Sequence, residues 1–267
     1  MWEHLQQRIV ALALAAVLSV AGAVAGPRIA HVQLPHMLPQ RTIALPILLY
    51  HRIGPLSTAL PALTKRLTVS PADFAAQMAW LVRHGYHAVS ELQAFDALEH
   101  GGKLPRNPLM ITFDDGYRDV LWNAAPVLRR LHLRATDFVI TGRISGPDSS
   151  FLTWPELVRL ERLGVEIGSH TVTHADLPAL SAAAAVPELR KSRLTLERHL
   201  RRAVQWLAYP YGKTDAAVAS LARKAGYVLA MTEMPGSSQS ARRPFFLHRD
   251  EILDTTGVSG LAADLAR

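Results

Sequence analysis

The sequence predicts an α/β fold in which helices cover a parallel sheet. Apolar runs of strand length alternate with helix-length segments from about residue 43 to residue 231. The first run, Ile43 to His51, is continuously apolar, as expected of a strand buried on both faces. Repeated strand-then-helix units of this kind form either a barrel or a doubly wound sheet. In both architectures, functional residues collect at the carboxyl ends of the strands.

Local signals mark the expected elements. Ser70 is placed as the N-cap of a helix that continues with Pro71, a residue favoured at the first helical position. Thr153 and Glu156 stand at capping-box spacing, and Gly164 ends that helix. In chain order we expect strand 43–51, helix 70–85, strand 86–90, helix 91–100, strand 109–113, helix 121–131, strand 136–140, helix 153–164, strand 165–169, helix 187–202, strand 205–212, helix 214–225 and strand 227–231.

Composition narrows the class of protein. The 267 residues suffice for one large α/β domain, and 49% hydrophobic with 19% charged residues is ordinary for a globular protein. Because cysteine is absent, thiolate metal ligands, a cysteine nucleophile and disulfides are excluded. The net charge of +7 suits an anionic envelope or nucleic acid equally well. Zinc-finger spacing, an aromatic RNA-binding motif and a dense Lys/Arg block are all missing, so nucleic acid is not expected as a partner.

The N-terminus carries an export signal. Residues 1–25 form a signal peptide or N-terminal anchor, because the apolar run 9–24 ends in an A-x-A pattern. Cleavage is favoured over anchoring, because the apolar run 9–24 is shorter than the stretch of about 20 apolar residues that spans a bilayer comfortably. Residues 26–42 read as a linker and residues 43–267 as the folded domain. The domain is therefore expected in the periplasm, the cell envelope or the medium, with membrane or envelope association through the N-terminus.

Residues able to bind a metal or transfer protons follow several predicted strands. The segment "SHTVTH" places His170 and His174 four residues apart directly after a strand. Two imidazoles with one carboxylate are a recurring hydrolytic metal site. In a parallel barrel such positions converge on one mouth although they are far apart in sequence. The strand-end residues are His51, Asp114, Asp115, His170, His174 and Tyr211.

The adjacent aspartates in "PLMITFDDGYRD" need an explanation. One of them could serve as a helix N-cap. That interpretation does not explain why both lie against a buried strand, because desolvating two like charges is costly unless a cation or a shared proton relieves them. The simplest assignment is that one carboxylate binds a metal and the other acts as the base for the attacking water.

Three motifs carry a family resemblance. "TFDDGY", "SHTVTH" and "LAYPYG", in this order and spacing, resemble successive motifs of the polysaccharide deacetylases, the NodB-type carbohydrate esterases of family 4. "PILLYHRI" resembles the branch that deacetylates poly-β-1,6-N-acetylglucosamine. The resemblance covers roughly residues 46–254. It implies a distorted (β/α) barrel of the NodB type, circularly rearranged so that the strand with the leucine-x-histidine motif comes first.

The resemblance also implies residue roles. Asp114 would be the general base and His51 the general acid, and the metal ligands would be Asp115, His170 and His174. The backbone N–H of Tyr211 would help to hold the oxyanion. Many family members have an arginine where this chain has Ala208. Arg249, in a segment that resembles the family's "LPR" motif but carries His248 in place of the proline, could supply the guanidinium.

The implied activity is hydrolysis that removes N-acetyl groups from an N-acetylglucosamine polysaccharide, as in biofilm exopolysaccharides. The alternatives are deacetylation of peptidoglycan or another envelope glycan, and a glycan-binding protein without catalysis. One divalent metal ion is expected: zinc first, with cobalt, nickel or iron also accepted by such ligands. Trp154, which begins a helix in a strand-end loop, could be a sugar platform or a core residue.

Overall fold

The structure is a computed structural model that describes residues 41–266, and these belong to one compact unit. The predicted export segment 1–25, and the predicted linker up to residue 40, lie outside the described residues. None of the helices in the described range combines the length and the hydropathy that a bilayer crossing needs.

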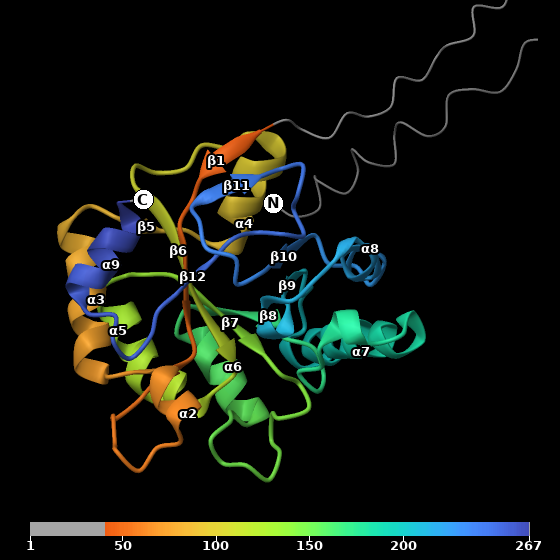
Figure 1. Ribbon diagram of the computed structural model, residues 1–267, viewed down its shortest axis with the longest axis horizontal. Coiled ribbons are helices and arrows are strands. Elements are labelled where there is room, and N and C mark those ends of the chain that lie inside the picture. The colour runs from red at the N-terminus through yellow and green to blue at the C-terminus, as the bar shows by residue number, and fades with distance from the viewer. Residues whose placement is uncertain (1–40, 267) are drawn as a thin grey trace, which may run out of the picture. The chain divides into compact units, whose positions relative to one another are not determined.

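A curled parallel sheet of eight strands forms a half-barrel, which confirms the predicted fold class (Figure 1). Its order is β10-β9-β8-β7-β6-β2-β12, and β5 pairs with β6 beside this path. The first strand of the sheet in the sequence is β2, which leads into His51. The strands are β2 (Ile47–Tyr50), β5 (His87–Ala88), β6 (Pro108–Asp115), β7 (Ala135–Val139), β8 (Val165–Ser169), β9 (Trp206–Ala208), β10 (Leu229–Met231) and β12 (Asp250–Glu251).

One short segment near the C-terminus joins the two edges of the sheet. Leu247 forms a parallel bridge with Met231 at the end of β10. A few residues later β12 pairs with β2, and the Ile252 N–H donates to the Leu49 carbonyl at 2.8 Å. Residues 247–252 therefore bridge the gap between β10 and β2.

Helices surround the half-barrel. In Figure 1, α3, α5 and α9 lie on one side, α7 and α8 lie on the other, and α2 and α6 lie near the carboxyl ends of the strands. The bounds are α2 (Ala62–Arg66), α3 (Pro71–Arg83), α4 (Glu91–Phe95), α5 (Ala125–Arg130), α6 (Trp154–Arg162), α7 (Ala182–Leu200), α8 (Ala216–Lys224) and α9 (Val258–Leu265). The predicted cap at Ser70 and the capping box of Thr153 with Glu156 are confirmed.

Some predicted boundaries are wrong. Helix α7 begins at Ala182 rather than Pro187, because the Ser181 side chain accepts the Ala184 N–H and caps an alanine-rich turn. The predicted helices 91–100 and 121–131 each contain a π-helical turn, at Asp96–His100 and Val120–Ala124. The predicted strand 43–51 is divided into β1 (Thr42–Ala44) and β2. The short strands β3 (Arg52–Ile53), β4 (Thr68–Val69) and β11 (Ser238–Ser240) were not predicted, because two or three residues show no periodicity.

Alternation along β6 decides which side chains enter the half-barrel. Ile111 and Phe113 belong to the larger apolar cluster, which also contains helix residues such as Phe74 of α3 and Leu128 of α5. Met110 belongs to a separate cluster with Phe138, and Thr112 hydrogen-bonds to the Leu48 carbonyl. Because side chains alternate along a strand, Asp114 shares the inner face with Met110 and Thr112.

Candidate metal centre

The carboxyl end of β6 is a strained turn. Asp115 has a φ of 79°, which non-glycine residues rarely adopt. Gly116 follows at φ 79°, and a Cβ there would lie 2.9 Å from the Val139 Cβ. Strained backbone of this kind persists only where the surroundings enforce it. The turn moves the chain away sharply and leaves Asp114 and Asp115 at the end of the strand.

The loop after β8 is equally constrained. Thr171 and His174 have φ values of 66° and 62°, and the His174 N–H donates to Thr171 Oγ1 at 3.1 Å. From α7, the Glu188 carboxylate accepts the N–H groups of Val172 and Thr173 at 3.0 and 2.8 Å. These contacts fix the loop that carries the second histidine.

Asp115, His170 and His174 form one cluster, with potential ligand atoms within 4.8 Å of one another. Each histidine Nε2 lies 3.6 Å from Asp115 Oδ1. His170 Nδ1 is 2.8 Å from the Ala208 carbonyl. A carbonyl can only accept, so Nδ1 carries the proton and the Nε2 lone pair faces the cluster.

The donor set fits a divalent metal. Asp115 Oδ1 is buried and accepts no hydrogen bond from any described residue. Burial, followed by the charge of Asp114, raises the pKa of Asp115 to about 7. Burial lowers the pKa of His170 to about 4 against the opposing effect of Asp114, so its imidazole is neutral at pH 7. A cation bound by these three residues would relieve the carboxylate repulsion and use the neutral imidazoles.

Arg249 holds Asp114. The two guanidinium Nη atoms lie 2.8 and 2.7 Å from the two Asp114 carboxylate oxygens, and both side chains are fully buried. Arg249 Nε donates to the Thr232 carbonyl at 2.9 Å. Burial favours the neutral acid, but Arg249 and His170 outweigh it and hold the pKa of Asp114 at about 2. Asp114 is therefore ionised and fixed in orientation, and the guanidinium expected from Arg249 contacts this carboxylate.

A second cluster adjoins the first. Potential ligand atoms of His51, Asp114 and Glu233 lie within 4.8 Å of one another. His51 is buried, and its Nδ1 has no hydrogen-bond partner among residues 41–266. Burial lowers the pKa of His51, and Asp114 opposes that effect. Burial, with Asp114 nearby, raises the pKa of Glu233 to about 7.

Sequence reasoning missed Glu233 and Asp119. Glu233 stands two residues after β10, so the strand-end rule that selected the other residues could have found it. Asp119 lies in the quoted "DDGYRD" segment; its carboxylate accepts from Arg52 Nε at 2.9 Å and from the Ile53 N–H at 3.1 Å. It thereby joins the turn after β6 to the two residues that follow His51.

The structure brings Tyr211 to the site but not Trp154. Tyr211, at φ 60°, has its ring edge-on to His174 with centroids 4.4 Å apart. Trp154 instead stacks on His199 at 3.8 Å and does not line the pocket. That pocket, of about 430 Å³, is lined by His51, Leu63, Arg66, Leu67, Asp115, Tyr117, Ile140, Arg143, Phe151, His174, Tyr211, Glu233 and Glu251.

The half-barrel gathers His51, His170 and His174 with several carboxylates at the carboxyl ends of its strands. Histidines with a carboxylate are the ligands of metal-dependent hydrolases. The sequence model described as polysaccharide deacetylase matches residues 101–230. YxkH of Bacillus subtilis (strain 168), which is named as a polysaccharide deacetylase, is 30% identical over 223 residues, covering 84% of this chain and 76% of YxkH. The chain belongs to the polysaccharide deacetylase family.

Two further relatives are informative. The poly-β-1,6-N-acetyl-D-glucosamine N-deacetylase of Staphylococcus aureus (strain MSSA476) is 28% identical over 174 residues, which are 61% of this chain and 60% of that enzyme. The deacetylase PplD of Streptococcus pyogenes, solved in complex with acetate, superposes with a TM-score of 0.78 at 28% identity. That match covers 84% of this chain and 99% of PplD.

Proposed function

We propose that this protein is an exported, metal-dependent deacetylase that removes N-acetyl groups from a poly-β-1,6-N-acetylglucosamine-like polysaccharide. The observation that carries the proposal is the cluster of Asp115, His170 and His174 beside an ionised Asp114 and a buried His51. The staphylococcal relative, which is named for this polymer, supports the choice of substrate.

Each residue has a separate task. Asp115, His170 and His174 would hold the metal, which when bound polarises the acetyl carbonyl and acidifies water. Asp114 accepts the proton of the attacking water. His51 donates a proton to the departing amine, and the Tyr211 backbone N–H donates to the oxygen of the tetrahedral centre. Acetate and a glucosamine amine are the products.

Acetate release tests the proposed function. The purified protein is expected to release acetate from oligomers of β-1,6-linked N-acetylglucosamine, to lose this activity in a chelator, and to regain it with one of zinc, cobalt, nickel or iron(II). Peptidoglycan and its fragments serve as the comparison substrate. Full activity in the chelator would contradict metal dependence. Faster acetate release from peptidoglycan would contradict the choice of polymer.

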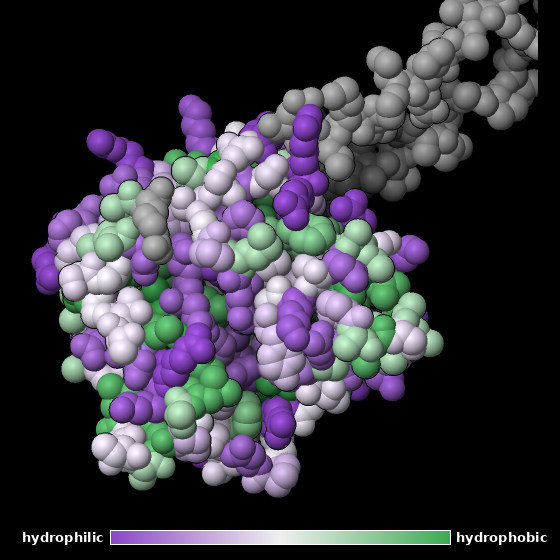
Figure 2. Space-filling model, in the orientation of Figure 1, coloured by the Kyte–Doolittle hydropathy of each residue, from purple (hydrophilic) through white to green (hydrophobic). Residues whose placement is uncertain are grey.

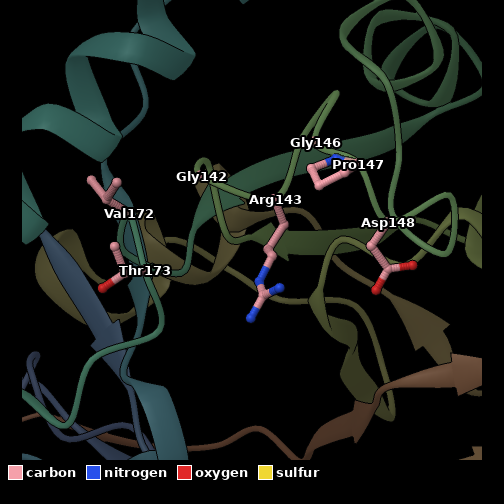
Figure 3. Close-up of a pocket in the computed structure, with 7 residues that line it drawn as sticks. All are labelled: Gly142, Arg143, Gly146, Pro147, Asp148, Val172 and Thr173. Carbon is pink, nitrogen blue, oxygen red and sulfur yellow. The ribbon is translucent and has the colours of Figure 1, made fainter.

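A side pocket of about 290 Å³ adjoins the main pocket at Arg143, which lines both. Figure 3 shows the Arg143 side chain reaching between Thr173 and Asp148. These groups, with the backbone of Gly142, offer donors and acceptors of the kind that hydroxyl-rich sugars need. We infer that this pocket holds a sugar next to the one being deacetylated.

Replacing Arg143 tests the side pocket. Arg143→Ala is expected to raise the KM for the polymer about 10-fold, because a hydrogen bond from a charged group is lost. The KM for a small aryl acetate, which does not reach the side pocket, should stay unchanged. Arg162→Ala removes another exposed arginine, from α6, and serves as the control. An equal rise in KM on both substrates would contradict this use of the side pocket.

A further inference from the structure

Basic residues gather at the end of the half-barrel where the strands begin. Helices α3 and α5 to α8 each precede a strand that runs back alongside, so their last turns lie where strands begin. Basic residues fill these last turns: Arg83, Arg129, Arg130, Arg159, Arg162, Arg198, Arg223 and Lys224. The opposite end, near the metal cluster, carries both charges: Asp114, Asp115, Glu233 and Glu251 lie there with Arg66 and Arg143.

Helix dipoles explain only part of this pattern. A basic residue in a last turn stabilises its own helix. Arg242 and Arg243 follow β11 and belong to no helix, yet they lie at the same end. Figure 1 places β1 and β11 where the parallel strands begin, and in Figure 2 hydrophilic side chains project along that edge. Three acidic residues at this end are paired with arginines: Glu161 with Arg202, Glu166 with Arg134 and Glu197 with Arg193.

Three arginines form the centre of this basic end. Arg223, Arg242 and Arg243 line a hollow of about 340 Å³ together with Ser220, Phe245 and Phe246, and no acidic residue lines it. Arg223 lies over the Phe245 ring at 4.9 Å, and Arg243 over Phe246 at 4.8 Å. Within residues 41–266, none of the three has a carboxylate within 4.0 Å. Stacked guanidinium groups keep their N–H edges available for phosphate.

The path of the chain indicates which kind of partner this surface contacts. Strand β1 pairs with β11, and the Ala241 N–H donates to the Arg41 carbonyl at 2.9 Å. The described chain therefore begins beside Arg242 and Arg243. Sixteen residues lie between Val24, the last residue of the apolar run, and Arg41, and this stretch extends to about 60 Å at most. Where the predicted N-terminal anchor is kept, the chain enters the domain beside this surface.

We propose that the Arg223, Arg242 and Arg243 surface docks on an anionic phospholipid membrane. The lipid phosphates would contact the three guanidinium groups. Docking in this orientation directs the metal cluster, at the other end of the strands, away from the lipid and toward the glycan. The proposal does not depend on the deacetylase activity, because binding to lipid is measured without substrate.

Vesicle binding by the full chain tests the proposal. Vesicles of phosphatidylglycerol with phosphatidylcholine are compared with phosphatidylcholine alone, so that any binding through the apolar N-terminal run is common to both. Changing the three arginines to glutamine should weaken binding to the anionic vesicles on the order of 100-fold, at about fivefold for each basic residue near the surface. Binding to neutral vesicles should not change, and added salt should erase the difference.

Two further variants separate charge from structure. Arg223→Lys with Arg242→Lys and Arg243→Lys keeps the charge and should retain binding to anionic vesicles within a few-fold. Lys65→Gln with Arg190→Gln and Lys191→Gln removes three exposed charges elsewhere and should also retain it. Thermal unfolding confirms that each variant is folded. Equal binding to both kinds of vesicle, or an equal loss in the control variant, overturns the proposal.

Discussion

Asp115→Asn is expected to lose the metal and the activity together. The carboxylate is the one anionic ligand proposed for the cluster, and removing it should weaken metal affinity by more than about 100-fold, since even groups that only support metal ligands are worth about 10- to 100-fold. Asparagine tolerates the positive φ at this position. The metal-free variant should be at least as stable as the metal-free native protein, because a repelled, buried carboxylate is removed. Metal content and thermal unfolding measure both effects.

Asp114→Asn is the matched contrast. It should keep the metal and lower kcat on the order of 10²- to 10⁴-fold, the usual contribution of a general base. It should also lower the free energy of unfolding, because Arg249 remains buried without its partner. If both variants lost metal equally, the division of tasks between the two aspartates would be wrong.

Arg249→Met is expected to destabilise the protein by about 3–5 kcal/mol at neutral pH, the usual cost of breaking a buried ion pair. Both partners are fully buried, so water cannot replace the guanidinium. The activity should fall as well, since Asp114 would lose its fixed orientation and its low pKa. Chemical denaturation of both proteins measures the loss of stability.

The pH dependence of this loss identifies its cause. In the native protein the pKa of Asp114 is about 2, below its ordinary value of 3.8. The ion pair therefore contributes stability that is fully present above about pH 4 and is lost as the pH falls toward 2. In Arg249→Met, burial without the guanidinium raises the pKa of Asp114 above its ordinary value, so the gap between native protein and variant should begin to shrink above pH 4 and be smallest near pH 2. The double variant Asp114→Asn, Arg249→Met should recover much of the stability; no recovery would point to packing rather than charge.

The sequence predicted the sheet well because its strands are apolar and its helices carry strong caps. Ser70 and Thr153 cap the helices that they were expected to begin. Predicted boundaries and short strands were wrong where a second interaction overrode the local sequence signal. Pro187 suggested a helix start, but the Ser181 cap six residues earlier let α7 form through the proline. Short strands such as β11 depend on tertiary pairing and left no signal in the sequence.

The site was predictable where its residues share strand ends. His170 and Asp115 meet because β8 and β6 both pair with β7 and run parallel, so their ends reach the same side. Their roles as metal ligands stay predictions. The contact of Arg249 with Asp114 spans 135 residues, and only the family resemblance suggested it. Glu233 and Asp119 were missed because isolated acidic residues look like surface charges until the loops are folded.

The segment that joins β10 to β2 supplies the partner of the proposed base, so the site depends on residues that are synthesised long after Asp114. Asp114 is made first, and its partner Arg249 follows 135 residues later. During synthesis or export, a chain that stops short of residue 247 has neither the guanidinium nor the strand that bridges the two edges of the sheet. The ionised base can therefore be buried in its final position only after residue 249 has emerged. A partly made or prematurely ended chain would not possess a working water-activating group.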